Sequence, residues 1–293
     1  MKILVTGSYG QLGSEIRMLT EKEGFQHNVF FADVDTLDIT DLNAVNAFFE
    51  DNEVDAVINC AAYTNVDQAE SDEELAYKIN AIGVENLAIN AKKKDAFFVH
   101  ISTDYVFDGS NTSPYLDTDP TNPIGVYGKT KLDGENKLRE IMDRSIIIRT
   151  SWVYSRFGKN FLKTMMWLGD NKEEINVVND QIGCPTYAGD LAKSILDIIE
   201  QQDKIKENVL VGFCNTGKCS WFDFASLIME KMGSKCKVYP VPSTEFPTVA
   251  KRPAYSLLSN DKIIKEFNVV SPDWKDSVEL VVKYFQENPE KRV

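Results

Sequence analysis

The sequence predicts an α/β protein: a doubly wound parallel sheet with a smaller C-terminal α/β lobe. Three observations support this prediction. An apolar strand at residues 2–6 runs into a glycine-rich turn and a helix. Strand and helix patterns then alternate as far as residue 150, as expected for parallel β-α-β units. Beyond residue 155 the alternation loosens into shorter elements, and the chain holds no repeat or linker, so we expect one compact unit.

Composition narrows the class of protein. The chain has 293 residues, 43% of them apolar, which is enough for a sizeable core. A net charge of −13 disfavours nucleic acid and anionic membranes as partners. No apolar run approaches the ~20 residues that span a bilayer, no leader precedes the first strand, and the five cysteines form no C-x-x-C pair. We therefore expect a soluble, cytoplasmic protein with reduced thiols. Two histidines leave little material for a zinc site or a Ser-His-Asp triad.

The glycine-rich turn follows the first strand directly. Gly7 is expected to make the tight turn, Gly10 to let the backbone approach a pyrophosphate, and Gly13 to let the helix pack on its strand. This is the first β-turn-α unit of a Rossmann fold. Its G-x-x-G-x-x-G spacing is typical of extended short-chain dehydrogenase/reductases. The alternative, a glycine turn that binds nothing, is disfavoured by its position after a buried-type strand.

The second predicted strand, residues 28–33, ends in a carboxylate. Asp33 lies 20 residues after Gly13, where a Rossmann fold presents an acid to the adenosine ribose. No Lys or Arg occurs between Lys22 and Lys78 to hold a 2′-phosphate. The pattern therefore favours NADH, while use of NADPH as well stays open. The alternative for Asp33 is a solvated residue at a strand end.

The next elements continue the alternation. Asp38 and Ile39, in the loop after the second strand, are candidates for lining the adenine. A helix at 42–51 and an apolar strand at 55–60 follow, and small residues at 61–62 would let a cofactor cross the strand ends.

The predicted chemistry lies after a long helix (72–93) and a fourth strand (96–102). Tyr127 and Lys131 are four residues apart and share a helix face. A nearby ammonium would lower the pKa of the tyrosine, whose free value of ~10 makes it a poor acid–base group. The hydroxyl of Thr103 could bond the same substrate oxygen. We interpret these three residues as catalytic; the alternative is a chance Tyr-x-x-x-Lys on an exposed helix.

We assign residues 1–155 to an NAD(P)-binding Rossmann domain, with 175–201 returning to it. The substrate-binding lobe is expected to consist of 156–174 and 202–293. The further elements that we expect are strands at 145–150, 175–178, 208–213 and near 238, helices beginning near 160 and at 220, a helix with apolar positions 191, 195 and 198, and a final helix at 276–286.

Three basic residues could meet a phosphate: Lys159, Lys251 and Arg252. Arg252 lies in an irregular loop, where recognition residues are common, and a solvated surface arginine is the alternative.

Beyond these patterns, nearly the whole chain resembles the dTDP-4-dehydrorhamnose reductases, extended short-chain dehydrogenase/reductases that complete dTDP-L-rhamnose synthesis. The blocks that carry the resemblance are G-x-x-G-Q-L-G at 7–13, A-A-Y-T-x-V-D at 61–67, S-T-D-Y-V-F-D-G at 102–109, Y-G-x-T-K at 127–131, R-T-S-W at 149–152 and D-Q-x-G-x-P-T at 180–186. The blocks at 102–109 and 180–186 are more specific than the glycine turn.

The resemblance implies roles for individual residues. Tyr127 would donate a proton to the keto oxygen of a 4-keto-6-deoxy sugar nucleotide, and Lys131 would hold the nicotinamide ribose. The residues that would contact the substrate are Thr103, Asp104, Trp152, Asn160 and Arg252. The residues that would line the dinucleotide, besides the three glycines, are Gln11, Leu12, Asp33, Asp38, Ile39, Ala62, Tyr63 and Thr64.

In some members of this family a Mg²⁺ ion, held by acidic side chains, bridges a homodimer, so the resemblance also implies a candidate metal site. Glu15 matches one ligand position and Asp190 stands near a second. Because no third ligand can be placed, we assign no metal residues.

Two other functions stay open. The reductases resemble the regulatory β subunit of methionine adenosyltransferase, so a non-catalytic dinucleotide-binding subunit is one alternative. A nucleotide-sugar epimerase or dehydratase of the same superfamily is the other. Dehydratases usually carry Asp-Glu after the threonine, whereas Asp104 and Tyr105 follow Thr103 here.

Overall fold

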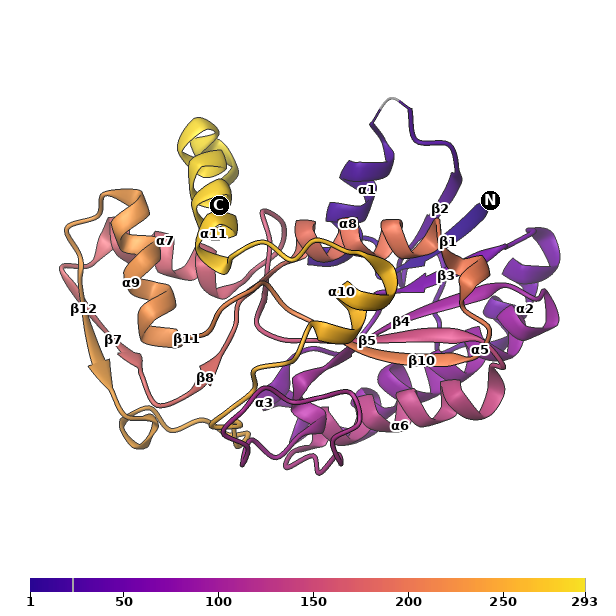
Figure 1. Cartoon of the computed structure of the whole chain (residues 1–293), viewed down its shortest axis with the longest axis horizontal. Helices are drawn as coiled ribbons and strands as arrows, with labels where there is room; N and C mark the ends of the chain where they lie inside the picture. The colour runs from indigo at the N-terminus through magenta and orange to yellow at the C-terminus, as the bar shows by residue number, and fades with distance from the viewer. Residues whose placement is uncertain (23, 293) are drawn as a thin grey trace.

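A six-stranded parallel sheet forms the centre of the computed structural model, which describes residues 1–22 and 24–292 (Figure 1). Its strand order is β10-β5-β4-β3-β1-β2. The strands are β1 (Lys2–Thr6), β2 (Asn28–Ala32), β3 (Ala56–Asn59), β4 (Phe97–Thr103), β5 (Ser145–Thr150) and β10 (Asn208–Phe213). Because β1 pairs with both β2 and β3, the winding of the sheet reverses there, and such sheets bind ligands at this switch point. The predicted fold class is confirmed.

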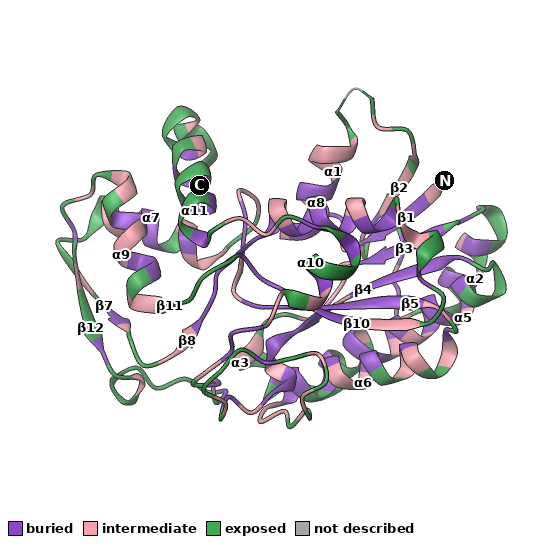
Figure 2. Cartoon of the chain, in the orientation of Figure 1, coloured by how far each residue is buried: buried purple, intermediate pink, exposed green. Residues whose placement is uncertain are grey.

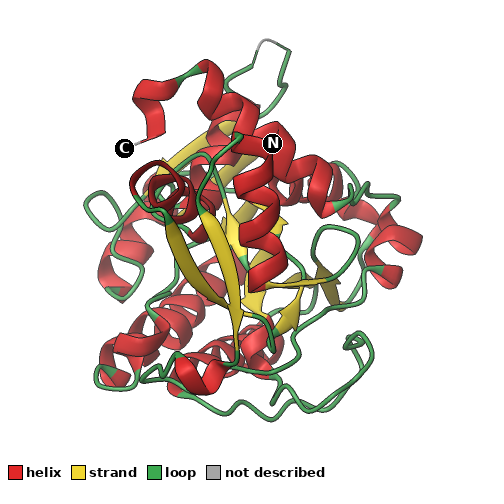
Figure 3. Ribbon diagram, turned by 90° about the vertical axis from the view of Figure 1, so that its left-hand side faces the viewer, coloured by secondary structure: helices red, strands yellow, loops and turns green. Residues whose placement is uncertain are grey.

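Helices cover both faces of this sheet (Figures 1 and 3). One face carries α1 (Gln11–Thr20), α8 (Ala188–Ile199) and α10 (Asp261–Phe267); the other carries α2 (Leu42–Asp51), α5 (Gly83–Lys93) and α6 (Val126–Ile141). Side chains alternate between these faces, since Ile3 and Val5 pack under α1 while Leu4 packs with α2 and α5. Figure 2 shows the central strands buried along most of their length. Burial on both sides explains why these strands read as continuous apolar runs.

Shorter elements connect the sheet to its helices. The helix predicted at 72–93 is α4 (Glu73–Tyr77), a π-helical turn (Lys78–Ile82) and α5 in succession. The connections also include α3 (Val66–Ala69) after β3 and a 3₁₀ turn (Asp104–Val106) after β4.

The smaller lobe has a core of its own, with Tyr154, Phe224 and Phe285 fully buried in it. Its helices are α7 (Phe161–Asn171), α9 (Trp221–Met232) and α11 (Trp274–Glu287). Its strands pair as β6 (Val153–Tyr154) with β9 (Thr186–Tyr187), β7 (Glu174–Val178) with β12 (Lys237–Val241), and β8 (Ile182–Gly183) with β11 (Cys219–Ser220). Isolated 3₁₀ turns are Gln202–Lys204, Ser243–Glu245 and Pro289–Arg292.

The expected division of the chain needs two corrections. Within 202–293, β10 pairs with β5 as the edge strand of the large sheet, and α10 packs on the same face as α8. Within 175–201, only α8 returns to the large sheet, because β7 and β8 pair with strands of the lobe. An apolar strand pattern cannot say which of two sheets the strand will join, and α10 was not predicted at all.

Within the part of the chain that the structure describes, every helix is too short or too polar to cross a lipid bilayer.

Candidate functional site

The glycine-rich turn joins β1 to α1 at the switch point of the sheet. Gly7 has a φ of +65°, and a Cβ there would lie 2.6 Å from the backbone nitrogen of Ala61. A Cβ on Gly13 would collide with the backbone of Gly7 and Ser8. Only glycine allows this positive φ and this approach of the helix to the strand without strain. The helix N-terminus therefore lies open beside the strand ends, and such an end is suited to an anion.

A central cavity of about 840 Å³ runs along the carboxyl ends of β1, β3, β4 and β5. It brings together residues from the glycine turn, the loop after β2, the end of β4, helix α6 and the loop before α7. The predicted site residues that line it are Gly7, Gly10, Gln11, Leu12, Gly13, Asp33, Asp38, Ile39, Ala62, Thr64, Thr103, Asp104, Tyr127, Lys131, Trp152 and Asn160. Tyr63 and Arg252 are not part of this wall.

One end of the cavity holds the carboxylates that follow β2. Asp33 accepts the backbone N–H of Tyr9 at 2.8 Å, which ties the loop after β2 to the glycine turn. Asp38 accepts the backbone N–H and the hydroxyl of Thr40 at 2.9 and 2.7 Å. Lys78 also lines the cavity, although sequence reasoning gave it no role. The π-helical turn that begins at Lys78 carries no signal that we could have found in the sequence.

The other end gathers the three predicted catalytic residues. Thr103 ends β4, while Tyr127 and Lys131 lie one turn apart on α6. Thr103 and Lys131 are buried, and the Lys131 Nζ donates a 2.7 Å hydrogen bond to the carbonyl of Ile101 on β4. The half-buried Tyr127 ring packs edge-on against Tyr105, with centroids 5.4 Å apart. Helix and strand thus present two hydroxyls and one ammonium to the same cavity.

The ionisation of this end differs from what the sequence suggested. Burial raises the pKa of Tyr127, and the hydrogen bond from Thr103 opposes that shift only in part. Burial lowers the pKa of Lys131 to about 8, against the nearby charge of Glu135. The net shift is upward because removal from water dominates, and Lys131 is not among the groups that shift the pKa of Tyr127 here. Tyr127 stays protonated at neutral pH and can act as an acid.

Asp104 is a buried carboxyl at the floor of this end. Burial raises its pKa to about 7, although contacts with the hydroxyls of Thr103 and Ser256 partly offset that shift. Its Oδ1 accepts the Thr103 hydroxyl at 3.0 Å. The proton content of Asp104 therefore changes close to neutral pH.

Three predicted substrate residues make contacts within the chain. The aromatic ring of Trp152 stacks on Trp221 with centroids 3.7 Å apart, and its backbone has a positive φ of 48°. Asn160 caps α7 by accepting the backbone N–H of Lys163 at 3.0 Å. Arg252 pairs with Asp67 of α3 at 2.8 Å and donates to the hydroxyl of Tyr105, in the 3₁₀ turn after β4, at 3.0 Å.

Tyr63 lies beside the cavity, not in its wall. Its hydroxyl donates to Asp72 at 3.3 Å, and its backbone N–H donates to Asn80 at 2.8 Å. Both bonds fix the loop after β3 against α4 and the π-helical turn.

The two candidate metal ligands are already paired. The fully buried Glu15 forms an ion pair with Arg156 and accepts hydroxyls from Ser155 at 2.8 Å and Tyr187 at 3.3 Å. Asp190 accepts from Ser277 at 2.6 Å and from the Asn215 amide at 2.7 Å. A divalent ion needs several free oxygen ligands, and here an arginine already balances the charge of Glu15. These residues do not fit a Mg²⁺ site.

Comparison with known proteins identifies the family of this chain. The family model described as the RmlD substrate binding domain matches residues 1–287. The chain belongs to this family. It is 40% identical over 286 residues to the spore coat polysaccharide biosynthesis protein SpsK of Bacillus subtilis (strain 168), with 98% of this chain and 97% of that protein covered.

Two solved structures agree closely with the fold. A dTDP-4-dehydrorhamnose reductase of Clostridium acetobutylicum ATCC 824 is 43% identical with a TM-score of 0.92, covering 98% of this chain and 100% of that one. The dTDP-4-dehydrorhamnose reductase of Bacillus anthracis str. Ames, solved in complex with NADP, is 38% identical with a TM-score of 0.90, covering 98% and 99%. The resemblance to these reductases is confirmed.

Proposed function

We propose that this chain is an NAD(P)H-dependent dTDP-4-dehydrorhamnose reductase, which reduces dTDP-4-dehydro-6-deoxy-L-mannose to dTDP-L-rhamnose. The observation that carries the proposal is one cavity with a dinucleotide turn at one end and Thr103, Tyr127 and Lys131 together at the other. Membership of the RmlD family and the names of full-length relatives support the same activity.

The dinucleotide would lie along the strand ends. The turn from Gly7 to Gly13 suits the pyrophosphate, and Asp33 would accept hydrogen bonds from the adenosine ribose. Lys131 would hold the nicotinamide ribose beside Tyr127. The bound reduced nicotinamide would supply a hydride to the keto carbon of the sugar.

Tyr127 would complete the reduction by donating its proton to the keto oxygen as that oxygen gains charge. The raised pKa of Tyr127 keeps the proton on the phenol until then, and Lys131 stabilises the phenolate left behind. Thr103 shares the substrate oxygen, and Asp104 lies next to it at the end of β4. Solvent returns the proton to Tyr127 after each turnover.

The diphosphate of the sugar nucleotide needs a local cation in so acidic a protein. Lys159 lines the cavity in the loop before α7 and is the candidate that the structure favours. Arg252 could join it only by leaving its ion pair with Asp67.

We further propose a preference for NADH. Asp33 would repel a 2′-phosphate. The guanidinium of Arg17, on α1, stacks 4.0 Å over the Phe31 ring and lies 3.7 Å from the Glu21 carboxylate, so it is already engaged within the chain. The Bacillus anthracis relative was solved with NADP, so the two cofactors must be compared directly.

The paired state of Glu15 argues against a magnesium-bridged homodimer, although a homodimer formed in another way stays a prediction. The regulatory-subunit alternative is not favoured, because it has no use for the assembled Thr103, Tyr127 and Lys131. A dehydratase is disfavoured, because Tyr105 stands where that reaction needs a glutamate.

The test is to follow the absorbance of NADH, and separately of NADPH, with purified protein and the 4-keto-6-deoxy sugar nucleotide. We expect oxidation of the cofactor, with higher kcat/KM for NADH, and no conversion of dTDP-glucose. Tight dinucleotide binding without turnover would instead support a regulatory subunit, and dehydration of dTDP-glucose would contradict the reductase assignment.

A further inference from the structure

One face of α6 carries a row of polar residues that extends beyond the catalytic pair. Tyr127, Lys131, Glu135 and Arg139 follow one another at intervals of four residues. Glu135 has no exposed surface, although it lies eight residues beyond Tyr127 and outside the central cavity. A fully buried carboxylate is rare unless its surroundings satisfy it, so this position needs an explanation.

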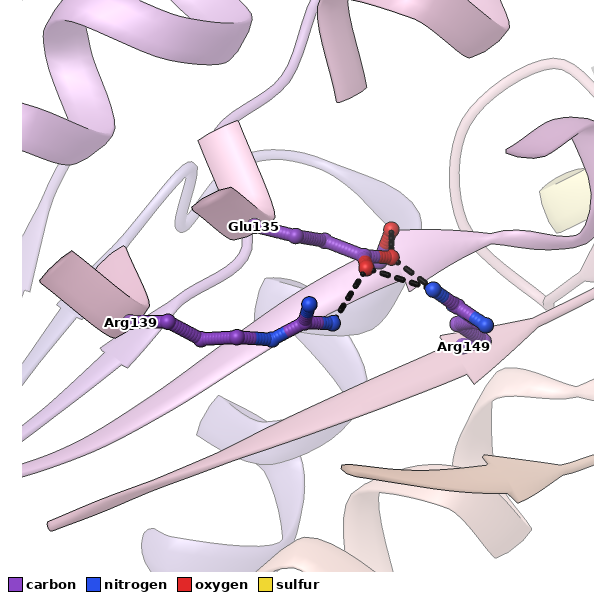
Figure 4. A network of polar contacts seen from close by, with 4 residues as sticks. Glu135, Arg139 and Arg149 are labelled. Carbon is purple, nitrogen blue, oxygen red and sulfur yellow. Dashed lines mark hydrogen bonds and ion pairs between the residues drawn. The ribbon is translucent and has the colours of Figure 1, made fainter. Parts of the chain in front are cut away.

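Four hydrogen bonds satisfy the Glu135 carboxylate. Ser102 donates to Oε1 at 2.6 Å; Arg149 donates from Nε to Oε1 at 2.9 Å and from Nη2 to Oε2 at 2.7 Å. Arg139 donates to Oε2 at 2.8 Å from the half-exposed end of the cluster. Figure 4 shows the two arginines meeting the carboxylate from the helix and from the sheet. This bidentate arrangement fixes Glu135 in one orientation as an ion.

The cluster joins the elements that carry the catalytic residues. Ser102 on β4 pairs in register with Arg149 on β5, and Thr103 follows Ser102 directly. Ile101, on the other side of Ser102, accepts the hydrogen bond from Lys131. Glu135 therefore holds Ser102 in place. Ser102 lies between Ile101, which accepts the Lys131 hydrogen bond, and Thr103.

We propose that Glu135 is a positioning residue for reduction: clamped by Ser102 and Arg149, its carboxylate holds the end of β4, with Thr103 and the Lys131 partner Ile101, against α6. This inference rests on the proposed function. The acid–base groups that act on Lys131 are Glu135 on its own helix and Cys60 after β3, and Lys131 in turn acts on His100 of β4.

Among the groups that act on Lys131, Glu135 is the main one that opposes the effect of burial. Burial raises the pKa of Cys60 to about 12 and lowers the pKa of His100, so both are neutral near pH 7. Burial also lowers the pKa of Lys131 to about 8, and Glu135 is the largest influence in the opposite direction. Without Glu135, Lys131 would lose its proton at a lower pH.

The main test is the double variant Glu135→Gln, Arg149→Met. Removal of Glu135 alone would leave Arg149 buried without its partner, and variants of that kind fold poorly, whereas neutral replacements of a whole buried pair are tolerated. Thermal denaturation would check the fold. The control is Glu140→Gln, which removes an exposed carboxylate from the same helix.

Two measurements report the protonation of Lys131 as a function of pH: kcat/KM, and the affinity for NADH determined by titration. In the double variant we expect the fall of both at high pH to begin at a lower pH than in wild type, because Glu135 is among the groups that act on the pKa of Lys131 whereas Arg149 is not. The control should follow the wild-type profile. Glu135→Asp keeps the charge with a shorter reach, so it should retain the wild-type pH profile at a reduced kcat.

A pH profile of the folded double variant that superimposes on wild type would overturn the proposal, whether or not the rate falls, because a purely structural role moves the rate alone. A shifted profile in Glu135→Asp would overturn it as well. The NADH titration keeps the two hypotheses apart: a wild type that binds NADH without turnover contradicts the proposed function, while Glu135 is still tested by the pH dependence of binding.

Discussion

At its dinucleotide end the central cavity is shaped by a glycine-rich turn and bordered by the partly exposed carboxylates Asp33 and Asp38, whereas at its other end it is built from buried ionisable side chains. Gly7, Gly10 and Gly13 shape the first end through their missing side chains. The second end depends on Lys131 and Asp104, which are both 2% exposed. The first end suits a ligand through its shape, its backbone N–H groups and the carboxylate of Asp33; the second is arranged to hold or release protons. We therefore expect changes at the second end to affect kcat and pH dependence, and changes at the first to affect cofactor affinity.

The strongest test of this comparison is Tyr127→Phe. We expect kcat to fall by about 10²-fold or more, since one positioned general acid is typically worth that much. NADH affinity should hardly change, because the turn at the other end of the cavity is untouched. Steady-state kinetics and an NADH titration measure the two effects, and Tyr77→Phe, at an exposed tyrosine, is the matched control. Wild-type turnover in the Phe variant would remove Tyr127 from the mechanism.

A pH-dependent stability is the next expected effect, and we assign it to Asp104 at the ionisable end. The pKa of Asp104 rises from its usual 3.8 to about 7 on folding. Below pH 4 the group is protonated in both states, so it costs nothing; stability is lost as pH rises from about 4 to 7, and the loss is complete above 7. The full loss is on the order of 4 kcal/mol.

Asp104→Asn should escape this loss. We expect the variant to gain stability over wild type as pH rises from 4 to 8, measured by urea unfolding at each pH. An equal pH dependence in both proteins would mean that Asp104 is solvated in solution, and the contrast between the two ends would weaken.

Sequence reasoning succeeded where local patterns determine the structure. The glycine spacing placed the turn, and the run from Ser145 to Thr150 gave β5 with its bounds. The four-residue interval between Tyr127 and Lys131 placed both on one helix face. In each case the deciding contacts lie within one element or one β-turn-α unit, so they leave a periodic trace in the sequence.

Sequence reasoning failed where contacts between segments far apart in the chain determine the structure. The pair of Arg252 with Asp67 joins residues 185 apart, and no pattern in either segment announces it. The raised pKa of Tyr127 depends on burial, and residues that pack with it, such as Tyr63 and Tyr105, come from separate elements. The Ser102–Glu135–Arg149 cluster was missed for the same reason, although Glu135, eight residues after Tyr127 on a helix, was a signal that could have been followed.

At the dinucleotide end, Asp33→Asn tests cofactor choice. We expect the ratio of kcat/KM for NADPH to that for NADH to rise about 5–10-fold, the effect of removing one partly exposed charge close to a phosphate. Asp35→Asn, at an exposed neighbour, is the control. The pH profile of kcat should not move, because this carboxylate lies at the other end of the cavity from Tyr127. If the ratio stays constant, another group decides between the cofactors.

The smallest effect is expected at Asn160, which lines the cavity and also caps α7. Its Oδ1 accepts the backbone N–H of Lys163, and its Nδ2 donates to the carbonyl of Ser155 at 2.8 Å. Both ends of its side-chain amide are therefore hydrogen-bonded within the chain. Asn160→Ala should lower stability by about 1 kcal/mol through the lost cap, with little change in KM for the sugar nucleotide. Asn171→Ala, at the other end of α7, is the control. Thermal denaturation and KM decide between the roles: a KM raised tenfold with unchanged stability would make Asn160 a substrate ligand, as the resemblance implied, and would extend the substrate end of the cavity to the start of α7.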